Sequence, residues 1–111
     1  MSLNDAELMT LLAIFRLGEE AYGVALCREL TSMTGRTAAL ASVYKTCERL
    51  EGRGLVSSRM GEPSPERGGR AKRFLRVTPQ GLRAIDTARA LLSSLWQDVP
   101  SFGKGLGRRR A

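Results

Sequence analysis

The stretch Leu40–Val77, LASVYKTCERLEGRGLVSSRMGEPSPERGGRAKRFLRV, decides the fold of this 111-residue chain. Its first part predicts an amphipathic helix, capped by Thr37 and running to about Arg53, because apolar residues recur every three or four positions. These apolar positions are Leu40, Val43, Tyr44, Cys47 and Leu50. Two strands are expected after the helix, at Leu55–Gly61, where side chains alternate in character, and at Arg73–Val77.

A loop rich in glycine, proline and charged residues separates the two expected strands. Residues Glu62–Gly69 (EPSPERGG) include two prolines and a Gly-Gly pair, which argue against regular structure there. We call the two strands and their loop the wing, because helix, strand, basic loop and strand outline a winged helix. The expected fold is mainly α with a small β-hairpin (α+β), a winged helix-turn-helix of order α-α-α-β-β-α.

Two further helices are expected before this stretch. Asn4 can cap the first helix, and Glu7 three residues later completes a capping box. That helix ends at Gly18 and is apolar around most of its circumference, which predicts burial on more than one side, with a partner subunit as the second cover. After a short connection, the second helix is expected over Gly23–Thr34, with Gly35 as its stop.

The last helix follows the second strand. Thr78 suits its cap and Pro79 its first position, and the helix is expected to run to about Asp98. Its apolar residues recur every three or four positions, which is close to a coiled-coil seam. They are Leu82, Ile85, Ala88, Leu92, Leu95 and Val99.

Positive charge is concentrated in part of the chain, whose formal net charge is +7. Met1–Gly35 has two basic and five acidic residues, whereas Arg36–Arg76 has ten basic and four acidic ones, and Val77–Ala111 has six and two. The charge therefore lies on the third helix, the wing and the C-terminal segment. This segregation favours a polyanionic partner over a basic surface that only confers solubility.

Several classes of site are excluded by residue content. The chain has no histidine, so it can build neither a Cys/His zinc site nor a His-based triad. Cys27 and Cys47 fall on apolar faces, which predicts buried thiols, with a redox sensor as the alternative. No apolar run reaches the roughly 20 residues that span a bilayer, and no secretion signal is evident. We therefore expect a cytoplasmic protein with no metal, no cofactor and no enzymatic activity.

Three phrases of the chain carry a family resemblance: AYGVALCREL (Ala21–Leu30), SVYKTCERLEGRGLV (Ser42–Val56) and GGRAKRFLRVTPQG (Gly68–Gly81). Together with the helix after them, they resemble the PadR-type winged-helix transcriptional regulators over about Leu8–Val99. Phe74 stands where family members often have tyrosine, and the short C-terminal part favours the compact subgroup with one dimerisation helix. The resemblance implies a homodimeric repressor that binds an inverted repeat near a promoter.

This reading divides the chain into three parts. Residues 1–78 are expected to form the DNA-binding domain, residues 79–99 the dimerisation helix, and residues 100–111 a disordered basic tail. Whether Arg108–Arg110 in that tail contact DNA is left open.

The resemblance also implies a DNA-contacting face. Ser42, Lys45 and Thr46 are expected to face the major groove, with Lys45 the best candidate for a guanine contact, and Arg49 is expected to bind a phosphate. Tyr44 is either a core residue or a phosphate ligand. The wing is expected to place four cations along the DNA backbone or in the minor groove, unless it is an ordinary basic hairpin. These are Arg67, Arg70, Lys72 and Arg73.

A dimer interface is expected between the first and last helices. Its predicted residues are Leu8, Leu12, Phe15, Ile85, Leu92 and Leu95. Trp96 on the same helix either packs there or stacks on a small aromatic effector, as the resemblance implies for some relatives. The alternative function is a winged-helix module that docks an acidic protein partner without sequence-specific DNA binding.

Overall fold

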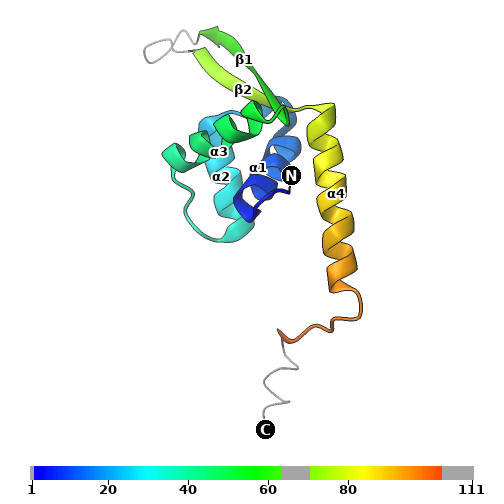
Figure 1. Cartoon of the computed structure of the whole chain (residues 1–111). Coiled ribbons are helices and arrows are strands. Elements are labelled where there is room, and N and C mark those ends of the chain that lie inside the picture. Colours follow the sequence, from blue (N-terminus) through cyan, green and yellow to red (C-terminus); the bar gives the residue numbers. More distant parts are fainter. Residues whose placement is uncertain (1, 64–70, 104–111) are drawn as a thin grey trace.

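A computed structural model describes residues 2–63 and 71–103 of the chain (Figure 1). The elements follow the expected winged helix-turn-helix order, with one short 3₁₀ turn added after the first helix. They are α1 (Asp5–Leu17), η1 (Gly18–Glu20), α2 (Gly23–Thr34), α3 (Leu40–Gly52), β1 (Val56–Pro63), β2 (Ala71–Val77) and α4 (Pro79–Trp96). Helices α1–α3 pack together, the β1–β2 hairpin projects from them, and α4 runs alongside the body (Figure 1).

The N-terminus of α1 has the predicted capping box. Asn4 Oδ1 accepts a hydrogen bond from the Glu7 backbone N–H at 2.8 Å, and Glu7 Oε1 accepts one from the Asn4 N–H at 3.0 Å. The helix ends at Gly18, whose φ of 59° lies in the left-handed region that favours glycine. Helix α2 ends in the same way at Gly35.

The start predicted for the third helix was wrong. Helix α3 begins at Leu40, and its cap is Ala39, which makes no side-chain capping bond, rather than Thr37. The chain before it stays attached to α2, because the Ala38 N–H donates to Thr31 Oγ1 at 3.2 Å. The helix ends at Gly52, close to the expected position.

The hairpin is longer than the sequence predicted. β1 continues through Glu62 and Pro63, which were expected to lie in the loop, and β2 begins at Ala71. Pairing is regular from Val56 opposite Val77 to Met60 opposite Arg73, and becomes irregular before Pro63. Proline has no N–H to donate to the ladder, but an edge strand beside an irregularity tolerates it. The rest of the predicted loop lies outside the described residues.

A third short strand segment supports the wing from its other side. Tyr22 forms an isolated antiparallel bridge with Phe74, and the Leu75 N–H donates to the Ala21 carbonyl at 2.8 Å. This places β2 between β1 and the residues that begin α2. The sequence pattern predicted only a connection at Ala21 and Tyr22, because two residues are too few to show the alternation of a strand.

The hydrophobic core contains residues of α1, α2 and α3, of the wing and of the first half of α4. Its largest fully buried side chains are Leu11, Ile14, Leu26 and Leu50. Thr78 caps α4 by accepting from the Gly81 N–H at 3.0 Å, and its own hydroxyl donates to the Gly54 carbonyl at 2.7 Å. Ile85 is buried, whereas every described side chain from Arg89 onward is exposed.

Helix α4 ends slightly earlier than the sequence predicted. The helix ends at Trp96, two residues before the expected Asp98, which has a φ of 65°. Within residues 2–63 and 71–103, no helix has the length and apolar character needed to cross a bilayer.

Candidate nucleic-acid interface

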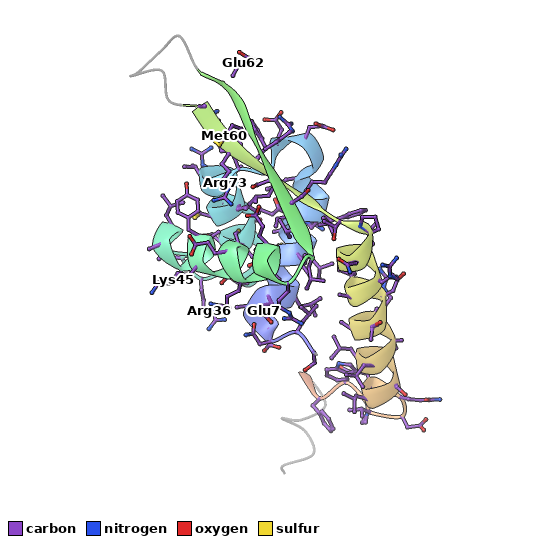
Figure 2. All side chains as sticks on the ribbon, turned by 45° about the horizontal axis from the view of Figure 1, so that its top comes forward. Glu7, Arg36, Lys45, Met60, Glu62 and Arg73 are labelled. Atoms are coloured by element: carbon purple, nitrogen blue, oxygen red, sulfur yellow. The ribbon has the colours of Figure 1, made fainter. Side chains whose placement is uncertain are left out.

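The solvent-facing side of α3 carries the exposed polar residues of the expected DNA-contacting face. Ser42, Lys45 and Arg49 are exposed, and Figure 2 shows Lys45 directed away from the helical body. Arg36, in the turn between α2 and α3, is also exposed, and sequence reasoning missed it. Among the described residues, the side chains of Lys45 and Arg36 have no ion-pair or hydrogen-bond partner, so both charges are available to an anion.

Thr46 does not share this exposure. Its side chain is buried, its hydroxyl donates to the Ser42 carbonyl at 3.1 Å, and it accepts from Arg49 Nη2 at 3.3 Å. The expectation that Thr46 faces a groove conflicts with this placement. The cause is the helical period, because Thr46 lies one turn from Val43 and Leu50 on the side of α3 that packs against the body.

Arg49 of α3 and Arg53, the residue after the helix, share one acidic partner, Glu7 of α1. Arg53 Nη1 lies 3.1 Å from Glu7 Oε1, and Arg49 Nε lies 3.6 Å from Glu7 Oε2. The hydrogen bond from the Asn4 backbone N–H lowers the pKa of Glu7, and both arginines lower it further, against the opposing effect of burial. Arg49 is still half exposed, so its guanidinium is oriented by Glu7 and Thr46 without being covered.

Tyr44 lies at the edge between core and surface. Its side chain is about half exposed, although its spacing grouped it with the core positions. The ring covers the first residue of α2, since a Cβ added to Gly23 would lie 2.5 Å from Tyr44 Oη. Gly23 therefore provides the space that this phenol occupies.

Two cations and two aromatic rings interact where the wing meets Tyr22, the residue before α2. Arg59 lies 4.7 Å from the Phe74 ring centroid, and Lys72 lies 4.3 Å from that of Tyr22. The rings of Tyr22 and Phe74 meet edge to face, with centroids 5.6 Å apart. These contacts hold Lys72 near the surface of the hairpin.

The remaining wing cations differ in their surroundings. Arg73 forms an ion pair with Glu51, the last acidic residue of α3. Arg67 and Arg70 lie outside the described residues.

The predicted interface residues divide into buried and exposed groups. Ile85 belongs to the core of its own chain, contrary to its expected place on a dimer surface, and Leu8 and Leu12 are half-buried. Phe15, Leu92 and Leu95 are exposed, as is Trp96.

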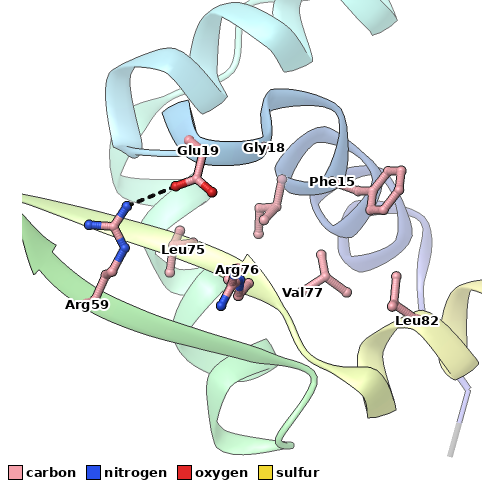
Figure 3. Close-up of a pocket in the computed structure, with 9 residues that line it drawn as sticks. Phe15, Gly18, Glu19, Arg59, Leu75, Arg76, Val77 and Leu82 are labelled. Carbon is pink, nitrogen blue, oxygen red and sulfur yellow. Dashed lines mark hydrogen bonds and ion pairs between the residues drawn. The ribbon is translucent and has the colours of Figure 1, made fainter.

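Cavities adjoin these exposed apolar residues. One of about 330 Å³ lies between α1 and α4 and is lined by Leu8, Leu12, Ile85, Arg89, Leu92, Ser93 and Trp96. Another of about 300 Å³ lies where α1, β2 and the start of α4 meet (Figure 3). At its edge Arg59 and Glu19 form an ion pair at 3.4 Å.

The cysteines are free thiols in α2 and α3. Burial raises the pKa of Cys47 to about 11 and also raises that of Cys27. Both thiols are therefore protonated near neutral pH. Within the described part of the chain, no three acidic, cysteine or histidine side chains gather as a metal site would require.

Comparison with known proteins adds a family match. The model of the "Transcriptional regulator PadR-like family" matches residues 11–87, well over half of the chain. A comparison with curated protein sequences finds no significant match.

Solved structures share the fold. A PadR family transcriptional regulator from Eggerthella lenta is 29% identical, with a TM-score of 0.64 over 88% of this chain and 80% of that one. A PadR family regulator from Clostridium difficile has a TM-score of 0.65 at 10% identity over 85% and 96% of the two chains. BpsR of Bordetella bronchiseptica, whose DNA binding is regulated by 6-hydroxynicotinic acid, has a TM-score of 0.62 at 18% identity over 98% and 76%.

Proposed function

Because the chain belongs to the transcriptional regulator PadR-like family, we propose that it is a homodimeric repressor that binds an inverted-repeat operator through α3 and the wing. The observation that carries this proposal is Lys45 on the exposed face of α3, which has no ion-pair or hydrogen-bond partner within residues 2–63 and 71–103. The family consists of transcriptional regulators rather than enzymes. The chain is accordingly a transcriptional regulator, and the repressor role, the operator symmetry and the dimer are what we propose.

On this proposal α3 enters the major groove, which is about 12 Å wide and admits one helix. Lys45 contacts a guanine edge and Ser42 an adjacent base, while Arg49 and the Tyr44 hydroxyl bind phosphates. Lys72 of the wing, together with Arg67 and Arg70, lies along the DNA backbone. Arg36, in the turn before α3, adds a phosphate contact.

The dimer is proposed to form through α4 and α1. Leu92, Leu95 and Trp96 are exposed in the C-terminal half of α4, where they leave an apolar surface in contact with water. Phe15 adds to this surface from α1. Burial of these side chains against a second copy gives a two-fold pair, and such a pair reads half-sites about one helical turn apart.

The cavity between α1 and α4 is the proposed effector site. Its lining is largely apolar with Trp96 as a stacking surface, and Arg89 supplies a cation for an acidic substituent. Regulation of BpsR by an aromatic acid supports the proposal by analogy of fold. Addition of a panel of hydroxybenzoic and hydroxypyridine carboxylic acids should quench the fluorescence of Trp96 and weaken DNA binding. If no compound changes either signal, no such effector site exists.

The test of DNA binding is a selection from random duplexes, followed by mobility shifts with the selected sequence. We expect an inverted repeat to be enriched. With about six to ten phosphate contacts, the affinity should fall by roughly 10³–10⁵ between 50 and 200 mM salt. Binding that is insensitive to salt, or no enrichment at all, would contradict the proposal and favour docking to an acidic protein.

A further inference from the structure

Glu51, in the last turn of α3, contacts both strands of the wing. One of its carboxylate oxygens accepts a hydrogen bond from Ser58 Oγ of β1 at 2.8 Å, and the other forms an ion pair with Arg73 of β2. Among the described residues, this is the only ion pair that joins α3 to the hairpin. The Glu51 side chain is about one-third exposed, so it lies at the boundary between the core and the solvent.

The strand register explains how one carboxylate reaches two strands. Ser58 lies opposite Leu75, and Met60 lies opposite Arg73, so these side chains project from one face of the hairpin. Leu75 is buried against the helices, whereas Met60 is exposed. The contacts of Glu51 thus lie at the point where apolar packing between the hairpin and the body ends.

Glu51 restrains the wing from the side of α3, whereas Tyr22 and Glu19 contact it from the side of α2. Figure 2 shows the hairpin extending from Arg73 past Met60 to Glu62, away from the helices. A projecting two-stranded hairpin is only marginally stable by itself. Because Glu51 binds both Ser58 and Arg73, it limits how far the hairpin can rotate relative to α3.

We propose that Glu51 is a positioning residue for DNA binding, which holds the wing at the angle to α3 that lets both contact one duplex. The inference rests on the proposed function. A wing that is already oriented loses less conformational freedom when DNA binds, so affinity rises without a direct contact. Arg73 then acts as the partner of Glu51 rather than as a phosphate ligand, and Lys72 beside it remains the cation available to DNA.

The chain contains a matched control for charge. Glu48 lies one turn before Glu51 on α3, is exposed, and has no ion-pair or hydrogen-bond partner among the described residues. Glu48→Ala and Glu51→Ala remove the same charge from the same helix. Only the second substitution removes the contacts with Ser58 and Arg73.

The first measurement needs no DNA. Hydrogen exchange of the backbone amides in β1 and β2 should become about tenfold faster in Glu51→Ala, while Glu48→Ala should match the unchanged protein. Arg73→Gln should also accelerate exchange, and the double variant should exchange no faster than Glu51→Ala. Unchanged exchange in Glu51→Ala, or additive effects in the double variant, would overturn the proposed restraint.

The second measurement is affinity for the selected duplex at one salt concentration. Glu51→Ala should bind about five- to tenfold more weakly than Glu48→Ala, although both lost one negative charge. Equal or tighter binding by Glu51→Ala would overturn the positioning role. If the unchanged protein binds no duplex, the proposed function itself fails, and hydrogen exchange still decides whether Glu51 restrains the wing.

Discussion

Glu7 in the first turn of α1 and Arg53 at the end of α3 meet at 3.1 Å, although 46 positions separate them in the chain. The same carboxylate also closes the capping box with Asn4 and lies near Arg49. The Glu7 side chain thus caps the start of α1 and attaches the C-terminal end of α3 to it. The contact links the stability of the fold to the orientation of Arg49.

Stability should depend on pH through Glu7. Its pKa is lowered in the folded state, so its stabilisation is complete above the unfolded value of about 4.3 and disappears as the pH falls through the folded value. Glu7→Gln retains an oxygen for the Asn4 N–H but loses the charge. We expect this variant to be about 1–3 kcal/mol less stable at pH 7 and the difference to shrink below pH 4, as measured by urea unfolding. A stability difference that does not change with pH would contradict the charge effect. Glu20→Gln is the control, because it removes the same charge from an exposed side chain.

Substitution of Gly81 by alanine should be costly. A Cβ at this position would lie 2.2 Å from the Leu55 carbonyl oxygen, a backbone atom that cannot move aside without shifting the start of the wing. We expect a loss of about 1–3 kcal/mol by thermal or urea unfolding. Gly52→Ala is the matched control, because no atom lies within 4 Å of its Cβ and alanine favours the helix. Equal stability of the two variants would show that the contact at Gly81 is relieved easily.

The thiol of Cys47 should react slowly. Its raised pKa, about 11, leaves only a small fraction of thiolate at pH 8, and its burial restricts access. Iodoacetamide should therefore modify the folded protein much more slowly than the protein in 6 M guanidinium, with peptide mass spectrometry identifying the modified site. Rapid labelling of Cys47 in the folded protein would instead support a redox role.

Lys45→Gln should weaken and broaden DNA recognition. Loss of one guanine contact is expected to cost about 1–3 kcal/mol and to relax preference at one base pair of each half-site. Arg83→Gln removes the same charge from an exposed position on α4 and should lower the affinity for DNA much less. The two variants are compared by competition binding with duplexes that differ at single base pairs. If both variants lose the same affinity at every position, Lys45 acts only through its charge.

Replacement of Leu92 and Leu95 by aspartate should separate the subunits. Charged side chains cannot be buried in an apolar interface without a partner, so sedimentation should show a monomer and operator binding should be lost. Circular dichroism checks that each subunit remains folded. Ser94→Asp is the control, because Ser94 lies nine residues after Ile85 and so on the opposite side of α4. A double variant that stays dimeric and binds DNA would rule out this interface.

Local signals predicted most of the fold. The Asn4 and Glu7 capping box, the glycine stops and the Thr78–Pro79 helix start were all confirmed, because at these positions the cap or stop is formed by residues close together in the chain. The start of α3 was wrong because Thr31 holds the preceding turn to α2. The strand pairing of Tyr22 with Phe74 could not be predicted, since neither residue signals its partner locally.

The sequence by itself determined the order of the elements, the segregation of positive charge and the apolar surface of α4, because these follow from composition and periodicity. Only the tertiary structure decided which cations are free to bind an anion. Arg53 is paired with Glu7 and Arg73 with Glu51, and Arg49 lies near Glu7 but stays half exposed, whereas Lys45 has no partner within the described residues. These pairings join positions far apart in the chain, and their geometry depends on how the helices and the wing pack.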